Sequence, residues 1–349
     1  MLSSIQFENV GPWGQRANLA FAPRLNVVTA NNGLDKAYIL EVAWALLTGS
    51  PERSFPLLHG QAEDASVFAA YDALILMNNR AGGSLEYHGS PKDWFYAASG
   101  STAHVVYAQA DGSVLVYVPT QVRAVKGGLP HDGVVHLTPE DLLHGREVGK
   151  LRVCNGLIAD WPYWQVMQPE VFARLNLVLE RLSPPDLPLR AGTPVLARAG
   201  ETRRHPTLHV LGRYLVPADW PFPVRRLASL AYAVTWAFAR TQALVERDPG
   251  IAPAEDLILL VDGPEVHLHP RAVAGLAPAL AELGTAARGA PSRTQVVLTT
   301  DSAALVHGAA SIADERDVWF DLELQPGALR DSVVARRRPL AESVGWEPC

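Results

Sequence analysis

The sequence predicts an α/β fold built on a mostly parallel sheet that is flanked by helices. Three short runs, at 25–29, 256–262 and 294–299, are apolar almost throughout, which is typical of strands covered on both faces. Each run is followed by a segment in which apolar residues recur at helical spacing. Strands that alternate with helices in this way favour a parallel sheet, so these three units form the predicted core.

The N-terminal part is expected to add an antiparallel β-subdomain. Short strands are predicted over 3–10 and 17–30, separated by Gly11, Pro12 and Gly14. A helix over 36–48 should end at Gly49. Further strands are predicted at 66–77, 84–88, 104–108 and 113–118, and the Asp111-Gly112 pair favours a hairpin between the last two.

The middle of the chain is predicted to be an inserted lobe. An aromatic-rich turn follows Asn155 and leads into a helix over 169–182, and five prolines predict an extended loop over 183–206. Beyond the lobe we expect a strand over 208–216, a buried helix over 227–245, a helix over 270–283 and a last strand over 318–324. We therefore assign residues 1–50 and 207–349 to the core, and 51–206 to an inserted β-rich and helical lobe.

Composition and charge restrict the class of protein. The chain has 349 residues, of which 48% are hydrophobic and 19% charged, which is typical of a globular protein with a sizeable core. Its net charge of −6 argues against a uniformly basic surface for nucleic acid. Cys154 and Cys349 are too few for a disulfide framework, and we see no signal peptide or membrane-spanning stretch. We expect a cytoplasmic protein without membrane contact.

The segment 30–37 has the layout of a phosphate-binding loop. An apolar strand ends in Asn31-Asn32-Gly33, Lys36 follows, and an apolar helix begins. In such loops glycines let backbone N–H groups surround the phosphates, and the lysine reaches the β- and γ-phosphates. Gly33 and Lys36 fit these roles.

Four segments, in order, resemble the ATP-binding head of the ABC-type ATPases of the RecF, SMC and OLD-nuclease group, P-loop NTPases of bacteria that are also described as AAA-family ATPases. They are NNGLDK, WPFPVRRLASLAYA, DGPEVHLHP and TTDS. The resemblance covers roughly 1–50 and 207–325, and NGLIADWPYWQ in the middle is similar to a segment of a bacterial subgroup. It implies an ABC-ATPase head and an ATP and Mg²⁺ site in which Asn32, Gly33, Lys36 and Asp262 bind the nucleotide.

The sequence departs from this family pattern in the phosphate loop. Ala30 stands in place of the first glycine, Asp35 in place of the glycine before the lysine, and Ala37 in place of the hydroxyl residue that binds Mg²⁺. Asp35 brings a carboxylate beside a polyanion, where like charges at ~4 Å cost on the order of 1–4 kcal/mol. The loop has thus lost a metal ligand and gained a repulsive charge.

The other three motifs depart as well. Gly263 stands in place of the catalytic glutamate after Asp262, and Glu265 should point elsewhere. Residues 220–223 (Trp-Pro-Phe-Pro) replace the serine–glycine signature that a second subunit would place over the γ-phosphate. Asp301 replaces a histidine of the last loop.

We interpret the chain as a catalytically degenerate ATPase that serves as a structural or regulatory subunit. It would form a homodimer through its former nucleotide face and bind a protein effector, and the resemblance implies a role in bacterial anti-phage defence. We assign no catalytic residue and no metal ligand. Asn32, Gly33, Lys36 and Asp262 then mark a vestigial nucleotide site, and no cofactor is expected.

Two alternative functions stay open. One is an ATP-binding protein with weak or partner-dependent hydrolysis, which would use ATP and Mg²⁺ with Lys36 and Asp262. The other is a nucleic-acid-binding module for DNA or RNA, which would use Arg225, Arg226 and the arginine run 336–338.

Individual residues also carry alternatives. Asp35, Asp262 and Asp301 would together offer oxygen ligands to a divalent cation, although surface acids are the preferred interpretation. Structural roles are preferred over a metal pair for His267 and His269. Trp161 and Trp164 fit a core or a stacking surface equally. An ion pair of Asp35 with Lys36 or Arg16 would fill the phosphate cavity.

Overall fold

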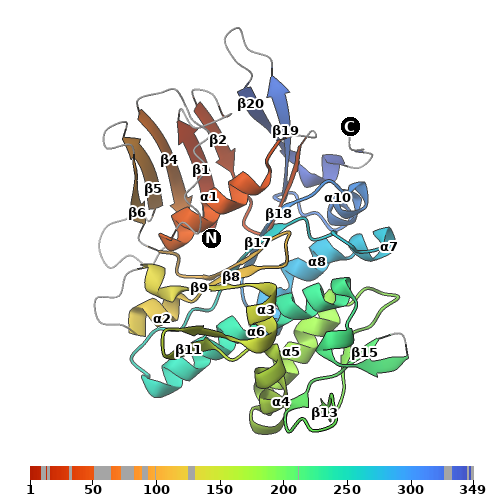
Figure 1. Cartoon of the computed structure of the whole chain (residues 1–349). Helices are drawn as coiled ribbons and strands as arrows, with labels where there is room; N and C mark the ends of the chain where they lie inside the picture. Colours follow the sequence, from red (N-terminus) through yellow and green to blue (C-terminus); the bar gives the residue numbers. More distant parts are fainter. Residues whose placement is uncertain are drawn as a thin grey trace.

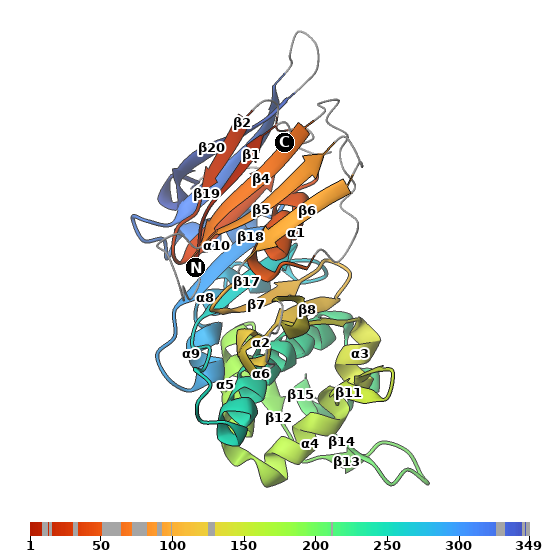
Figure 2. The ribbon, with the colours of Figure 1, turned by 90° about the vertical axis from the view of Figure 1, so that its left-hand side faces the viewer.

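The computed structural model describes residues 1–8, 13, 16–30, 34–50, 64–71, 82–88, 93–98, 100–124, 130–210, 212–325, 332–343 and 346. Its described residues form two large β-sheets with helix α1 (Ala37–Thr48) between them, three small sheets of two or three strands, and a helical lobe on the other side of the larger sheet (Figures 1 and 2). Among the helices of the described residues, none is long and apolar enough to cross a membrane.

The larger sheet confirms the predicted mostly parallel core. Its eight strands follow the order β20-β19-β3-β18-β17-β7-β8-β9, with the five from β19 to β7 parallel and the three edge strands antiparallel. The strands are β3 (Leu25–Ala30), β7 (His104–Ala108), β8 (Val114–Tyr117), β9 (Val134–Leu137), β17 (Leu257–Asp262), β18 (Thr294–Thr299), β19 (Val318–Gln325) and β20 (Ser332–Pro339). β7, β8 and β9 extend this sheet although they belong to the stretch 51–206.

The smaller sheet confirms the predicted antiparallel β-subdomain. Its strand order is β2-β1-β4-β5-β6, and every neighbouring pair is antiparallel. The strands are β1 (Leu2–Glu8), β2 (Arg16–Ala20), β4 (Asp64–Tyr71), β5 (Gly82–His88) and β6 (Asp93–Ala98). Helix α1 is buried along almost its whole length and ends at Gly49, which adopts the left-handed conformation (φ +65°) that glycine tolerates.

Long helices cover the opposite face of the larger sheet. The longest, α6 (Phe222–Arg247), packs against α5 (Pro169–Leu182) and α9 (Leu283–Arg288), and its first half is buried almost all round. The remaining helices are α2 (Pro119–Ala124), α3 (Pro139–His144), α4 (Leu157–Met167), α7 (Pro270–Val273), α8 (Leu276–Ala281) and α10 (Ala303–Ala310).

The expected single strand over 208–216 is instead an antiparallel pair of short strands, 208–210 and 213–215. Three further local predictions were wrong. The aromatic-rich turn after Asn155 is helix α4, because Trp161 and Trp164 bury one face of it despite Pro162. The helix over 270–283 is divided into α7, α8 and the start of α9, since Gly275 and Pro278 are poor helix residues.

The stretch 183–206 is the third. It is not a plain loop but forms paired strands of two or three residues with the segment that follows. These strands are β12 (Arg190–Ala191), β13 (Val195–Leu196), β14 (Arg204–His205), β15 (Leu208–Val210) and β16 (Arg213–Leu215), and a separate hairpin joins β10 (Arg146–Val148) to β11 (Leu151–Cys154).

Candidate functional site

The candidate site lies where the parallel strands end. Strands β3, β18, β17 and β7 are neighbours and run in the same direction, so the segments that follow them meet at one edge of the sheet. Those segments contain Lys36, Asp301, Asp262 and Gln109. Asn31, Asn32 and Gly33 of the predicted nucleotide site lie outside the described residues.

Lys36 is held by Asp301. Its Nζ lies 2.6 Å from Asp301 Oδ1, and the lysine side chain is only 14% exposed. The sequence suggested Asp35 as a partner within the loop, but the structure joins Lys36 to the loop after β18 instead. Asp35 is exposed, and the Arg16 side chain lies outside the described residues. The cation of the phosphate loop is therefore already neutralised by a carboxylate of the same chain.

Asp262 and Glu265 are both hydrogen-bonded within the same edge. Thr299 Oγ1 donates to Asp262 Oδ1 at 2.6 Å. Thr300 Oγ1 and the Asp301 amide donate to Glu265 Oε1 at 2.7 and 3.1 Å. Glu265 thus fixes the loop that carries Asp301, and it does not take the position of the glutamate missing at 263.

The turn after β17 is shaped by local backbone geometry. Gly263 has φ +51° and His267 has φ +68°, an unusual value for a residue with a side chain. His267 packs edge-on against Phe222, with ring centroids 4.7 Å apart, and His269 caps α7 by accepting from the Arg271 amide at 3.3 Å. These contacts fit structural roles for both histidines.

The acidic trio does not assemble into a cation site. The described part of the chain contains no group of three or more histidine, cysteine, aspartate or glutamate side chains that could hold a metal ion. Asp262 and Asp301 are instead joined to Thr299 and Lys36.

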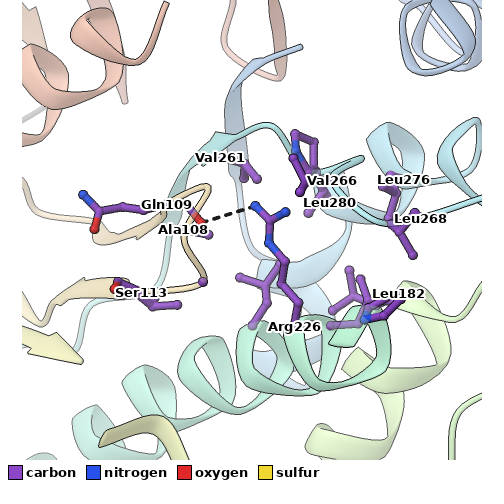
Figure 3. Close-up of a pocket in the computed structure, with 16 residues that line it drawn as sticks. Ala108, Gln109, Ser113, Leu182, Arg226, Val261, Val266, Leu268, Leu276 and Leu280 are labelled. Atoms are coloured by element: carbon purple, nitrogen blue, oxygen red, sulfur yellow. Dashed lines mark hydrogen bonds between the residues drawn. The ribbon is translucent and has the colours of Figure 1, made fainter. Parts of the chain in front are cut away.

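Arg226 connects α6 to this edge (Figure 3). Its Nη2 donates to the Asp262 carbonyl at 2.9 Å and to the Gln109 carbonyl at 3.3 Å. Burial lowers the pKa of Arg226, and the nearby charges of Glu265 and Asp262 oppose this effect. The Arg226 guanidinium thereby connects α6 to the ends of β17 and β7.

A small apolar pocket lies beside Arg226. Its volume is about 30 Å³, and its walls come from the end of β7, from α6, from the turn after β17 and from α8 (Figure 3). A space of this size is far smaller than the clefts of about 300 Å³ or more that bind small molecules, so it would not hold a nucleotide.

The segment 220–223 is used for packing. The Trp220 indole is buried, donates to the Leu215 carbonyl at 2.8 Å and contacts Trp161. Pro221 precedes α6 and gives it no side-chain cap, while Phe222 is 47% exposed. Trp161 and Trp164 are core residues, which resolves their two interpretations in favour of the core.

Four of the five arginines proposed for nucleic acid already have partners among the described residues, whereas the buried Nε of Arg225 lacks a hydrogen-bond partner there. Arg336 pairs with Glu323 at 2.8 Å, Arg337 donates to the Ala20 carbonyl, and Arg338 lies over the Trp319 ring. Arg226 donates to the backbone carbonyls of Gln109 and Asp262. This geometry does not favour the nucleic-acid alternative, because few of these cations are left for phosphates.

Comparison with known structures identifies the fold. An SMC head bound to the C-winged helix domain of ScpA aligns over 96% of this chain and 98% of its own, at 13% identity and a TM-score of 0.54. An SMC head with an extended coiled coil, bound to the C-terminal domain of ScpA derived from Pyrococcus furiosus, aligns over 98% and 97%, at 11% identity and 0.52. The chain has the fold of an ABC-type ATPase head.

Other comparisons add less. A structure of the recombination mediator RecF aligns over 92% of this chain at 11% identity and a TM-score of 0.43. No protein-family model and no curated protein matches the sequence. The two SMC heads confirm the predicted ABC-ATPase head at the level of the fold.

Two features of this edge of the sheet were not predicted from the sequence. Gln109 comes directly after the predicted strand 104–108, but that strand was assigned to the inserted lobe and its position beside β17 was not foreseen. The Lys36–Asp301 pair joins residues 265 positions apart. In the sequence, the pair was indicated only by the opposite charges of Lys36 and Asp301 at two positions of the predicted nucleotide site.

Proposed function

We propose that this protein is a catalytically degenerate ATPase head that serves as a structural or regulatory subunit. The observation that carries the proposal is the ion pair between Lys36 and Asp301 at 2.6 Å. A nucleotide phosphate would have to displace Asp301 from the lysine, and the displaced carboxylate would still lie beside the polyanion. The pair therefore acts against phosphate binding.

The neighbouring positions support the same proposal. Ala37 begins α1 with a methyl group where Mg²⁺ would need a hydroxyl, and Gly263 has no carboxylate to polarise water. Asp262 is already hydrogen-bonded to Thr299. In this proposal ATP and Mg²⁺ are not cofactors, and Asn32, Gly33, Lys36 and Asp262 are vestiges of their site.

A homodimer through the former nucleotide face is part of the proposal. Phe222 is 47% exposed at the start of α6 and packs edge-on against His267, so an apolar ring is presented beside the turn after β17. A second copy would bury such a ring. The SMC heads that share this fold are bound to ScpA, and we extend partner binding to this chain. A role in bacterial anti-phage defence rests on the family resemblance alone.

Two measurements test the proposal. Phosphate release from ATP should be the same for the wild-type protein and for Lys36→Ala, and a rate that depends on Lys36 would contradict the degenerate site. Light scattering should show a dimer that Phe222→Ser weakens, with Leu324→Ser as a control because Leu324 is equally exposed (46%) but lies on β19.

A further inference from the structure

Exposed apolar side chains are concentrated in residues 146–216, which we call the lobe. Twelve large hydrophobic side chains are exposed among the described residues, and nine of them lie between residues 146 and 216. These nine are Val148, Leu151, Tyr163, Val166, Met167, Leu177, Val195, Leu196 and Tyr214. Single exposed hydrophobic residues are ordinary, whereas exposed apolar side chains that lie together mark binding surfaces, so we expect such a surface in this part of the described chain.

The same lobe is basic within an acidic chain. Of the 30 basic and 36 acidic residues, the stretch 187–216 holds five arginines, no lysine and one acid, Glu201, which gives +4 in a chain of −6. Arg204 donates to the Pro194 carbonyl, and Glu201 pairs with His205. Arg190, Arg198, Arg203 and Arg213 have neither an ion pair nor a side-chain hydrogen bond with any described residue.

Strands β12 to β16 form two small sheets that hydrogen bonds join into one ribbon. β12 and β13 follow each other on one side, and β14 and β15 on the other. Between the two pairs, the Gly192 amide donates to the Thr207 carbonyl at 2.9 Å and Thr207 Oγ1 donates to the Thr193 carbonyl at 3.1 Å. The apolar Val195 and Leu196 of β13 therefore belong to the same structural unit as β15 and β16.

Tyr214 is fixed on the outer face of this ribbon. Arg190, His209 and Tyr214 are directly opposite one another on β12, β15 and β16, so their side chains share one face, while Leu208 is buried on the other. The Tyr214 ring packs edge-on against His209 at 5.2 Å. A Cβ added to Gly192 would lie 2.5 Å from Tyr214 Cδ1, so the ring lies directly over this glycine. The phenol is thus held in place yet remains 64% exposed.

We propose that the exposed side chains of this ribbon dock an acidic, apolar segment of a protein partner. We call these side chains the lobe surface and define it by Arg190, Val195, Leu196, Arg198, Arg203 and Tyr214. Tyrosine and arginine are enriched at protein interfaces and lysine is depleted, which is the composition found here. The unpaired arginines attract a partner of negative charge. The lobe surface of a second copy is a poor occupant, because two regions of +4 repel each other.

The lobe surface is separate from the proposed function. It uses no residue of the nucleotide edge, so it would bind its partner whether or not ATP binds. The ATP measurements and the docking measurement below can therefore fail independently of each other.

Fluorescence anisotropy with three labelled peptides tests the proposal. The first is an amphipathic peptide with a leucine face flanked by glutamates, the second replaces the glutamates with lysines, and the third replaces the leucines with serines. We expect the full-length protein to bind the leucine–glutamate peptide and to bind the other two at least about tenfold more weakly. Arg190→Glu with Arg198→Glu, and separately Leu196→Ser, should each weaken binding of the first peptide about tenfold.

Matched variants and other probes complete the test. Arg247→Glu with Arg271→Glu reverses two exposed arginines outside the lobe surface, and Leu324→Ser removes an exposed leucine outside it; both should leave binding unchanged. Equal binding of the leucine–glutamate and leucine–lysine peptides would overturn the proposal. So would tighter binding, through the same arginines, to a 20-base-pair DNA duplex or to anionic phospholipid vesicles.

Discussion

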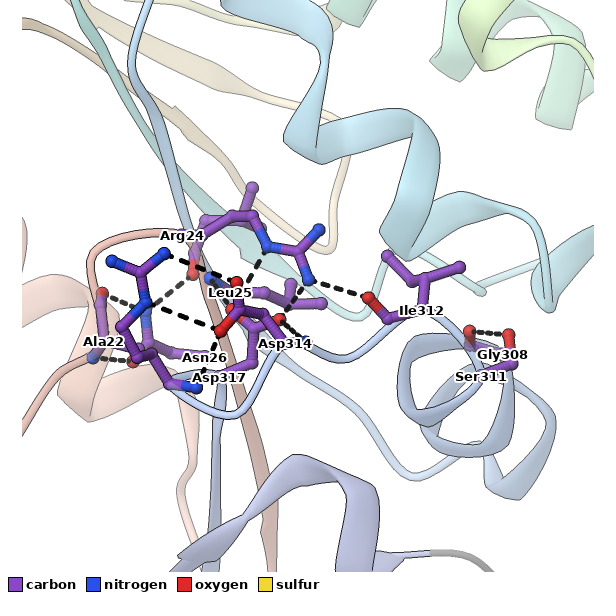
Figure 4. Close-up of polar contacts among 11 residues, drawn as sticks. Ala22, Arg24, Leu25, Asn26, Gly308, Ser311, Ile312, Asp314 and Asp317 are labelled. Carbon is purple, nitrogen blue, oxygen red and sulfur yellow. Dashed lines mark hydrogen bonds and ion pairs between the residues drawn. The ribbon is translucent and has the colours of Figure 1, made fainter.

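The Asp317 carboxylate is expected to be one of the main stabilising groups at the start of β3. It lies in the turn before β19, is 1% exposed, and accepts from the Leu25 and Asp314 amides at 3.2 and 2.8 Å (Figure 4). Arg24 also pairs with it and donates to the Ile312 carbonyl at 2.8 Å. One buried carboxylate thus joins the segment before β3 to the segment before β19.

Removing this carboxylate should cost several kcal/mol. Asp317→Ala leaves two backbone amides and a guanidinium without their acceptor, and each buried unsatisfied partner costs about 1–3 kcal/mol. Arg24 is 38% exposed, so water replaces part of its loss. We therefore expect the free energy of unfolding to fall by about 3–5 kcal/mol for Asp317→Ala, and by about 1–3 kcal/mol for Arg24→Ala, which leaves the two amide bonds in place.

Urea denaturation measures these differences. Arg316→Ala is the matched control, because Arg316 lies in the same turn, is 75% exposed and forms its ion pair with Asp314, so its loss should cost less than about 1 kcal/mol. If Asp317→Ala were no more destabilising than Arg316→Ala, the description of this network as a buried support of the core sheet would be wrong.

Three further predictions concern buried positions. Burial lowers the pKa of His104 to about 4 from 6.5, so the folded protein binds fewer protons than the unfolded chain between these values. Stability should fall as the pH drops through this window, by up to about 3 kcal/mol, and urea denaturation at pH 7 and 5 should show a weaker dependence for His104→Gln. Gly308→Ala would place a Cβ 2.0 Å from the Ala274 carbonyl oxygen and should lower the free energy of unfolding, measured by thermal denaturation, by about 1–3 kcal/mol. Gly275→Ala is the control and should leave it unchanged, because its added Cβ would have its nearest contact at 3.9 Å. Tyr232→Phe removes the hydroxyl that donates to Asp160 at 2.8 Å and should lower the free energy of unfolding, measured by urea denaturation, by about 1–3 kcal/mol. An unchanged free energy of unfolding would show that this hydrogen bond does not stabilise the fold.

The core of the fold follows from local sequence patterns. The apolar runs that form β3, β17 and β18 are buried on both faces. Each run is six residues long, so the sequence of the strand alone is enough to predict its burial. The same holds for α6, whose apolar residues surround the helix. Weak local signals explain the errors: β12 to β16 are held by pairing between segments, and no run of two or three residues can reveal a partner strand.

The candidate site was predictable in its residues but not in its contacts. The chain order of the motifs placed Lys36, Asp262 and Asp301 at one edge, because the ends of parallel strands meet there. The choice of Asp301 over Asp35 as the partner of Lys36 depends on where two loops sit in space, and Glu265 and Thr300 determine this for one of them. Such long-range choices are set by tertiary packing and leave no periodic trace in the sequence.

Isothermal titration calorimetry with ATP and Mg²⁺ tests the central claim most directly. The Lys36–Asp301 pair, Ala37 and Gly263 together predict that the wild-type protein and Lys36→Ala give the same heats, with no magnesium-dependent binding. Micromolar binding that requires Mg²⁺ and disappears in Lys36→Ala would contradict the degenerate site.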